Sequence, residues 1–147
     1  KPAATIDDVV GAVAAAGRPR TTFTVTTLCP ACVAGSTEEA IAGVKPWVTF
    51  YLGAMGAKGK NFYVELADRY GYGDAARDVQ ERYLAGDRAG AQDALPDELV
   101  AAVTIATDEA GLPGRLAEFS AAGFDLIIAI PGGDELGTVR ALASAAA

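Results

Sequence analysis

The chain has 147 residues, enough for one domain with a sizeable core, and 51% of them are hydrophobic. It contains no histidine, which excludes Ser-His-Asp and Cys-His catalysis and every metal site that needs a histidine ligand. A formal net charge of -7, with the basic residues scattered along the chain, argues against a nucleic-acid partner.

The hydropathy and the first residue of the chain give expectations about its cellular location and its processing. No stretch approaches the roughly 18 consecutive apolar residues of a membrane helix, and nothing resembles a signal peptide. We therefore expect a soluble, cytoplasmic protein with no membrane partner. Because the chain begins at Lys1 instead of methionine, we also expect it to have been processed or cut from something longer.

The predicted elements alternate between helices and short strands. Phe23 and Val25 alternate within a β-branched run and predict the first strand. Ser36 stands three residues before Glu39 as a capping box for a long helix, which Pro46 is expected to kink or divide. In chain order, the sequence predicts a helix over 6–16 capped by Thr5, a strand over 21–28, the long helix from Ser36 to Met55, helices near Asn61, Ala75, Asp87 and Pro96, a strand over 103–106, a helix over 112–122, a strand over 124–130 and a final helix capped by Asp134.

This order of strands and helices defines the fold class. Strands separated by helices favour βα units on a parallel sheet, and the unbroken apolar run after Asp125 is typical of a parallel strand covered on both faces. We therefore predict an α/β fold, with residues 1–147 forming a single domain around about three parallel strands.

A glycine-rich loop over 53–61 is the first candidate binding segment. It narrowly misses the phosphate-binding pattern G-x-x-x-x-G-K-[ST], and it follows a helix where that pattern requires a strand. Lys58 and Lys60 stand beside the predicted helix start at Asn61, a combination that can attract an anion. The alternative is a solvated interhelical loop in which Asn61 is only the N-cap.

Cys29 and Cys32 form a C-P-A-C motif, for which three interpretations are open. A thioredoxin-like redox site requires the first cysteine at a helix N-terminus, yet the best helix start lies four residues beyond Cys32. A structural disulfide is the second interpretation, and two small buried residues in a loop between strand and helix are the third. Two cysteines without histidine cannot complete a zinc site, so no metal is predicted.

The segment 51–100 closely resembles the bacterial luciferase-like monooxygenases, especially the oxidoreductases that use coenzyme F420. The matching elements are MG at 55–56, NFY at 61–63, RYGY at 69–72, YLAG at 83–86 and PDELV at 96–100. This segment looks like the helix-rich insertion that family members carry before strand seven, the penultimate strand of their (β/α)8 TIM barrel. The flanks agree with this resemblance, since 21–28, 103–106 and 124–130 look like strands six, seven and eight. The resemblance covers nearly the whole chain but only the C-terminal half of a barrel, which needs about 250 residues.

The resemblance implies an activity and a site. The intact enzyme would bind F420 or FMN and transfer a hydride to or from a small organic substrate, whereas this chain alone is expected to be inactive because much of the cofactor site belongs to the missing strands. No catalytic residue can be carried over. The residues that the resemblance places near the mouth of the pocket as cofactor-binding are Met55, Gly56, Lys58, Lys60, Asn61 and Tyr63.

Two other functions remain open at this stage. Three parallel strands leave an open edge and an uncovered face, so the chain could be a half-barrel binding or assembly module that forms a homo-oligomer or pairs with a missing barrel half. The third possibility is a small thiol oxidoreductase that uses Cys29 and Cys32.

Overall fold

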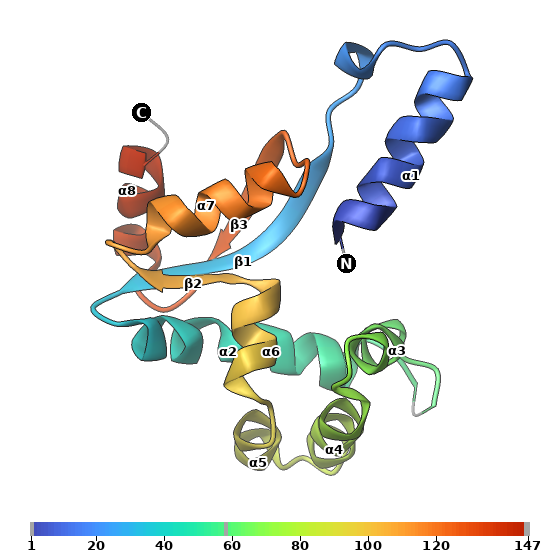
Figure 1. Cartoon of the computed structure of the whole chain (residues 1–147). Coiled ribbons are helices and arrows are strands. Elements are labelled where there is room, and N and C mark those ends of the chain that lie inside the picture. Colours follow the sequence, from blue (N-terminus) through green and yellow to red (C-terminus); the bar gives the residue numbers. More distant parts are fainter. Residues whose placement is uncertain (1, 58, 146–147) are drawn as a thin grey trace.

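The computed structural model of the protein describes residues 2–57 and 59–145, and Figure 1 shows their arrangement. Three strands and a larger number of helices alternate along the chain. In order they are α1 (Pro2–Ala15), the 3-10 turn η1 (Arg20–Thr22), β1 (Thr26–Ala34), α2 (Thr37–Ala54), α3 (Phe62–Arg69), α4 (Gly73–Leu84), α5 (Arg88–Asp93), α6 (Asp97–Val103), β2 (Ile105–Asp108), α7 (Leu112–Ala121), β3 (Leu126–Pro131) and α8 (Glu135–Ala145). None of the described helices is long and apolar enough to cross a membrane.

The strands form one parallel sheet in the order β2-β1-β3. β1 pairs with β3 from Thr26 to Ala31, and with β2 only from Ala31 to Ala34. The predicted α/β class with three parallel strands is therefore confirmed. The predicted helix-rich insertion is confirmed as well, since α3 to α6 lie between the first strand and the penultimate one.

The predicted position of the first strand is wrong. β1 begins at Thr26 and runs through the C-P-A-C motif to Ala34, because Pro30 sits where a strand tolerates a proline. The amide of Gly132 in the β3 connection donates to the carbonyl of Ala31 at 2.8 Å, so the backbone polar groups of Ala31 face β3. The backbone polar groups of successive strand residues point to opposite edges of the strand. Those of Pro30 therefore face the edge on the β2 side, where the pairing with β2 has not yet begun.

Other boundaries move by a few residues. β2 and β3 each start two residues later than predicted, and α1 begins at Pro2, before the expected cap at Thr5. Pro46 does not divide the long helix, because α2 is continuous from Thr37 to Ala54. Ser36 is confirmed as the N-cap of α2, since its hydroxyl accepts from the amide of Glu39 at 3.2 Å.

The strand order also corrects the comparison with three successive barrel strands. In a (β/α)8 barrel each strand lies beside the next one in the chain. Here β1 separates β2 from β3, so the three strands cannot be strands six, seven and eight in sequence. β1 and β3, adjacent over six register positions, have the arrangement of consecutive barrel strands, and β2 adds four residues beside the carboxyl end of β1.

The two faces of the sheet have different surroundings. α7 and α8 cover the face that carries Cys29, Ala31 and Val33, and Figure 1 shows these helices on the side of the sheet opposite α2. We call the other side the open face. α2 covers its carboxyl end at Cys32 and Ala106. Its amino end leaves three large side chains half-exposed, which we call the apolar strip: Leu28, Leu126 and Ile128.

α2 approaches the sheet so closely that one helix position requires glycine. A Cβ added to Gly43 would lie 2.6 Å from the Cys32 sulfur and 3.3 Å from the Cα of Gly133. The backbones on the two sides are equally close, since a Cβ on Gly132 would lie 2.7 Å from the Gly43 carbonyl oxygen. These contacts fix the position of α2, and α3 to α6 pack in turn on its far side, with buried Val79 and Leu95.

We predict that Gly43→Ala destabilises the protein, because the added methyl group must displace backbone or the buried Cys32 sulfur. An overpacked core costs about 1–3 kcal/mol. The matched control is Gly114→Ala in α7, where an added Cβ meets nothing within 4 Å and alanine should stabilise the helix by about 0.5–1 kcal/mol. Urea unfolding measures both changes, and equal free energies of unfolding for the two variants would contradict the close approach.

Candidate functional site

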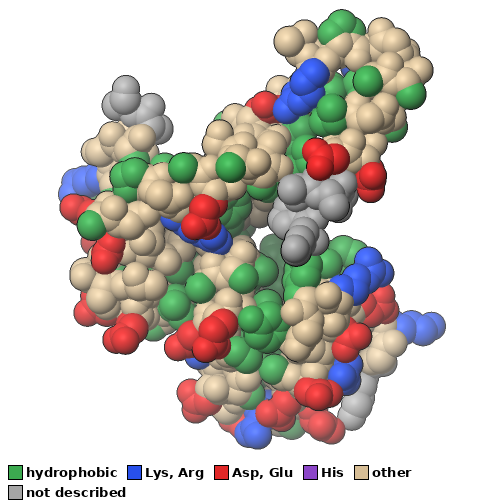
Figure 2. Space-filling view, viewed as in Figure 1, with side chains coloured by type: hydrophobic (Ala, Val, Ile, Leu, Met, Phe, Trp, Pro, Cys, Tyr) green, Lys and Arg blue, Asp and Glu red, His purple; other side chains and the backbone are tan. Residues whose placement is uncertain are grey.

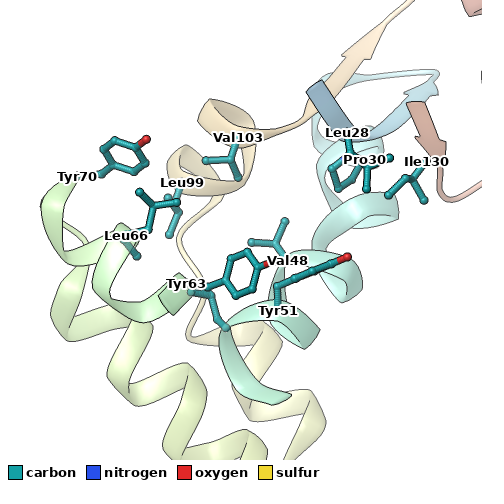
Figure 3. Close-up of a pocket in the computed structure, with 12 residues that line it drawn as sticks. Leu28, Pro30, Val48, Tyr51, Tyr63, Leu66, Tyr70, Leu99, Val103 and Ile130 are labelled. Atoms are coloured by element: carbon teal, nitrogen blue, oxygen red, sulfur yellow. The ribbon is translucent and has the colours of Figure 1, made fainter. Parts of the chain in front are cut away.

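A cavity of about 360 Å³ lies between the open face of the sheet and helices α2, α3 and α6. Figure 3 shows its walls, with Pro30 and Ile130 on the sheet side and Tyr63 and Leu66 on the α3 side. We call it the tyrosine pocket, and its lining residues are Leu28, Pro30, Val48, Tyr51, Leu52, Tyr63, Leu66, Ala67, Tyr70, Leu99, Val103 and Ile130. This volume is in the range of small-molecule sites.

None of the described residues that line the tyrosine pocket has a charged side chain. Its side-chain polar atoms are the hydroxyls of Tyr51, Tyr63 and Tyr70, and none of these hydroxyls makes a hydrogen bond to another residue in the described part of the chain. Figure 2 shows hydrophobic side chains gathered around α6 in the middle of the molecule, whereas charged side chains lie toward the edges of the view, many of them over α4 and α5. The pocket thus offers an apolar surface with a few free hydroxyl groups.

The tyrosine rings are held by other aromatic rings. The Tyr51 and Tyr63 rings meet edge to face with centroids 4.9 Å apart, and Trp47 stacks on Tyr51 at 6.1 Å. Both arrangements are favourable aromatic geometries. A ligand that enters the pocket would therefore meet a partly preorganised wall on the α2 and α3 side.

Of the described residues that were predicted to bind the cofactor, Met55, Gly56, Lys60 and Asn61 lie between α2 and α3, and only Tyr63, in α3, lines the pocket. Met55 and Lys60 are exposed, and Lys58 lies outside the described residues. Gly56 allows a tight turn, since a Cβ there would lie 2.8 Å from the Cα of Asn61. Their role in holding a cofactor stays a prediction.

Asn61 is fully engaged within the protein. Its side-chain oxygen accepts from the amides of Tyr63 at 2.9 Å and Val64 at 3.4 Å, and its side-chain nitrogen donates to the carbonyl of Leu52 at 2.6 Å. The side chain is buried, so these bonds are protected from water. The predicted N-cap is confirmed, and the same amide ties the start of α3 to the end of α2.

Sequence reasoning missed most of the pocket wall. The sheet residues Leu28, Pro30 and Ile130 carry no chemical motif, and neither do Leu99 and Val103 on α6. The one available signal was the even spacing of residues 28, 30 and 32, which share one face of a strand. That signal was lost because the strand was placed too early in the chain.

Cys29 and Cys32 are free, buried and on opposite faces of β1. Cys29 belongs to the core under α7 and α8, and Cys32 to the core under α2. Three residues of extended strand separate their Cα atoms by roughly 10 Å, beyond the limit of about 7 Å for a disulfide. The disulfide and thiol-redox interpretations are therefore wrong. The expectation of small buried residues is confirmed, although they lie in a strand and not in a loop.

The environment of both thiols favours the protonated form. Burial raises the pKa of Cys29 to about 11, even though the Arg115 guanidinium nearby acts in the opposite direction. Burial likewise raises the pKa of Cys32, while a hydrogen bond with Thr138 opposes this change. A thiol nucleophile requires a lowered pKa, so neither cysteine has the properties of a reactive one.

The acidic residues at the carboxyl ends of β2 and β3 have structural partners. The Asp108 carboxylate accepts from the amide of Gly111 at 2.8 Å, and Asp134 accepts from the amide of Gly137 at 3.0 Å, which confirms Asp134 as the cap of α8. Among residues 2–57 and 59–145, no group of three or more acidic or cysteine side chains is placed to hold a metal ion. The tyrosine pocket is therefore the best candidate site.

Comparison with known proteins shows the family. The luciferase-like monooxygenase family matches residues 1–126 of the chain. A Mycobacterium tuberculosis protein named as a coenzyme F420-dependent oxidoreductase is 30% identical over 129 residues, which are 88% of this chain and 37% of that protein. The solved structure of the coenzyme F420-dependent tetrahydromethanopterin reductase from Methanopyrus kandleri has a similar fold, with a TM-score of 0.77 and 19% identity over 96% of this chain and 40% of that one. The chain thus spans less than half the length of either relative.

We predict that Asn61→Asp destabilises the protein by about 1–3 kcal/mol. The carboxylate can still cap α3, but it cannot donate to the buried Leu52 carbonyl and places a negative charge against it. Lys60→Ala, one residue earlier and exposed, should change the free energy of unfolding by less than about 0.5 kcal/mol. Thermal and urea unfolding compare the two variants, and an Asn61→Asp protein as stable as the parent would show that the amide has no structural role.

We also predict that the protein loses stability as the pH rises from about 9 to about 11. The folded chain keeps the Cys29 proton up to its raised pKa of about 11, whereas the unfolded thiol loses its proton near the ordinary cysteine pKa of 9.0. The unfolded state therefore binds fewer protons in this window, and the contribution of about 2 kcal/mol, present below pH 9, disappears by pH 11.

The control for this pH dependence is Cys29→Ala. Unfolding free energies of both proteins, measured at intervals from pH 8 to 11, should fall more steeply for the parent, since the lysines and tyrosines titrate equally in both. Parallel curves would contradict the raised pKa of Cys29.

Proposed function

Because the chain belongs to the luciferase-like monooxygenase family, we propose that it is the C-terminal part of an oxidoreductase that transfers a hydride between coenzyme F420 and a small organic substrate. The observation that carries this proposal is the tyrosine pocket, which opens on the sheet face that would point into a barrel. In (β/α)8 enzymes, active sites are built at the carboxyl end of the strands.

The names of the relatives favour F420 over FMN as the cofactor. Both relatives described above are named as F420-dependent, and one of them shares 30% of its aligned residues with this chain. FMN remains the alternative, because an aromatic ring of similar shape would meet the same apolar wall.

The described residues fit the ring of such a cofactor but not its anionic tail. The apolar strip of Leu28, Leu126 and Ile128 offers a flat surface for an aromatic ring next to the pocket. Among the described residues no lysine or arginine lines the pocket, so the phosphate and carboxylate groups of the tail need cations from elsewhere. Our candidates are Lys60 on the neighbouring loop and Lys58, two residues earlier in the sequence, together with Met55, Gly56 and Tyr63.

The chain's own residues would position the substrate and exclude water. When bound, the cofactor supplies the hydride chemistry, as a deazaflavin or flavin ring can accept or give a hydride. Tyr51 and Tyr63 would orient the substrate from the α2 and α3 side, and Leu99 and Val103 would close the α6 side against water. No charged group in the lining can act as an acid or base, so proton transfers would involve a tyrosine hydroxyl or a group from the rest of the barrel.

We propose that the chain alone is inactive. The apolar strip is half-exposed, and β1 and β3 each keep an unpaired stretch of edge, since β2 covers only Ala31–Ala34 of β1. The strands of a complete barrel would pair with these edges and shield the strip. Pairing with such strands, or with a second copy of the chain, and a cytoplasmic location complete this proposal.

The half-exposed strip also supports the second candidate function, a half-barrel module that binds or assembles without catalysis. Its three side chains form an apolar surface of the kind that marks interaction sites. This function differs from the first in one measurable respect, since an assembly module has no affinity for the cofactor.

We predict that the complete product of the reading frame binds F420 at least tenfold more tightly than FMN, and that the 147-residue chain binds either of them at least tenfold more weakly than the complete product. Quenching of cofactor fluorescence during titration measures all four affinities. Tighter binding of FMN would replace F420 in the proposal. A complete product that binds neither cofactor would overturn the oxidoreductase function and favour the assembly module.

A further inference from the structure

We propose that the tyrosine pocket selects an uncharged, mostly hydrocarbon substrate that carries one hydroxyl or carbonyl oxygen. This inference rests on the proposed function, because it names the class of substrate that the same site would accept.

The pocket wall excludes charged ligands. The 12 lining side chains that the structure describes are uncharged, and the sheet side consists of Leu28, Pro30 and Ile130. A carboxylate or phosphate that entered would lose hydration without gaining a counter-ion from these residues, which is unfavourable. A neutral hydrocarbon group gains by the same transfer, because its apolar surface leaves water.

Of the basic residues on the neighbouring elements, Lys45 and Arg115 are already paired, and Arg69 of α3 lines a different hollow. Lys45, the only basic residue of α2, pairs with Asp97 at 2.7 Å at the start of α6. The Arg115 guanidinium donates to the carbonyls of Ala101 and Thr104 at 2.8 and 2.7 Å, around the end of α6. Neither cation is free to turn toward an anionic substrate in the pocket.

The hydroxyls of Tyr51 and Tyr63 provide the polar contact. Figure 3 shows the Tyr51 ring reaching from α2 toward the sheet side, where Pro30 and Ile130 lie. A phenol can donate one hydrogen bond and accept others, so it suits a single hydroxyl or carbonyl oxygen. The aromatic contacts of Tyr51 with Trp47 and Tyr63 limit its movement, so that the hydroxyl position also selects the orientation of the substrate.

The test uses two fluorescent probes that share one skeleton. N-phenyl-1-naphthylamine is neutral, and 8-anilino-1-naphthalenesulfonate adds one sulfonate to it. Titrations in about 0.5 M NaCl screen the general repulsion between the anionic probe and this acidic protein. We expect the neutral probe to bind the 147-residue chain at least tenfold more tightly than the sulfonate. Equal affinities, or tighter binding of the sulfonate, would overturn the proposed substrate class.

Three variants locate the bound probe. Val103→Glu puts a charge into the pocket wall at a partly exposed position and should weaken binding of the neutral probe about tenfold. Leu84→Glu on α4 is the matched control, since this side chain is about half-exposed and does not line the pocket, whereas Leu126→Glu tests whether the probe binds the apolar strip instead. A loss of binding in Leu126→Glu but not in Val103→Glu would place the probe on the strip and overturn the proposal.

A positive charge at the same position should increase the affinity for the sulfonate probe, a result that misfolding of the variant would not produce. Val103→Lys should bind the sulfonate probe at least threefold more tightly than the parent, because the ammonium group supplies the missing counter-ion. Unchanged affinity for the sulfonate would contradict the location of the site.

The role of the tyrosines is tested with a second pair of ligands. The double variant Tyr51→Phe, Tyr63→Phe should weaken the binding of 1-naphthol three- to tenfold and leave the binding of naphthalene unchanged. Only 1-naphthol has a hydroxyl group that can form a hydrogen bond with the tyrosines. Equal effects on both ligands would exclude the hydrogen bond. None of these titrations contains F420, so a failure here leaves the proposed cofactor untouched, and a failure to bind F420 leaves the pocket selectivity untouched.

Discussion

The contact between Gly43 of α2 and the carboxyl end of the sheet is the constraint on which the rest of the molecule depends. Because Gly43 has no side chain, α2 approaches until its backbone meets the Cys32 sulfur and the Gly132-Gly133 segment. The contact covers one end of the open face and leaves the other end uncovered. The tyrosine pocket lies between these two ends, so its position follows from the close approach.

β1 connects the two cores because its side chains alternate between them. Cys29 points to the layer of α7 and α8 and Cys32 to the layer of α2, which explains why two cysteines in a C-x-x-C motif have no shared chemistry. Thr138 connects the N-terminal turn of α8 to the same strand, since its buried hydroxyl accepts from the amide of Val33 at 3.1 Å. Both helical layers are therefore anchored on one strand.

Local signals predicted the local structure well. Ser36, Asn61 and Asp134 act as the expected helix caps because capping depends on residues three positions apart or closer. The position of β1 was not predictable in this way. A strand tolerates a proline only where its nitrogen faces an edge that needs no N–H donor. At Pro30 this is the edge toward β2, whose pairing starts one residue later, at Ala31 and Ile105, and Ile105 is far away in sequence. The pocket shares this property, since its walls come from five separate segments joined only by the fold.

The apolar strip and the tyrosine pocket form one continuous feature, because Leu28 belongs to both. A hydride donor and its acceptor must lie in contact and away from water, so a site for both requires the strip to be covered. In the described chain nothing covers it, and β1 and β3 keep free edges beside it. Hence the elements that would complete the sheet would also complete the site, and the proposed activity depends on the same strand pairing that would protect the exposed edges.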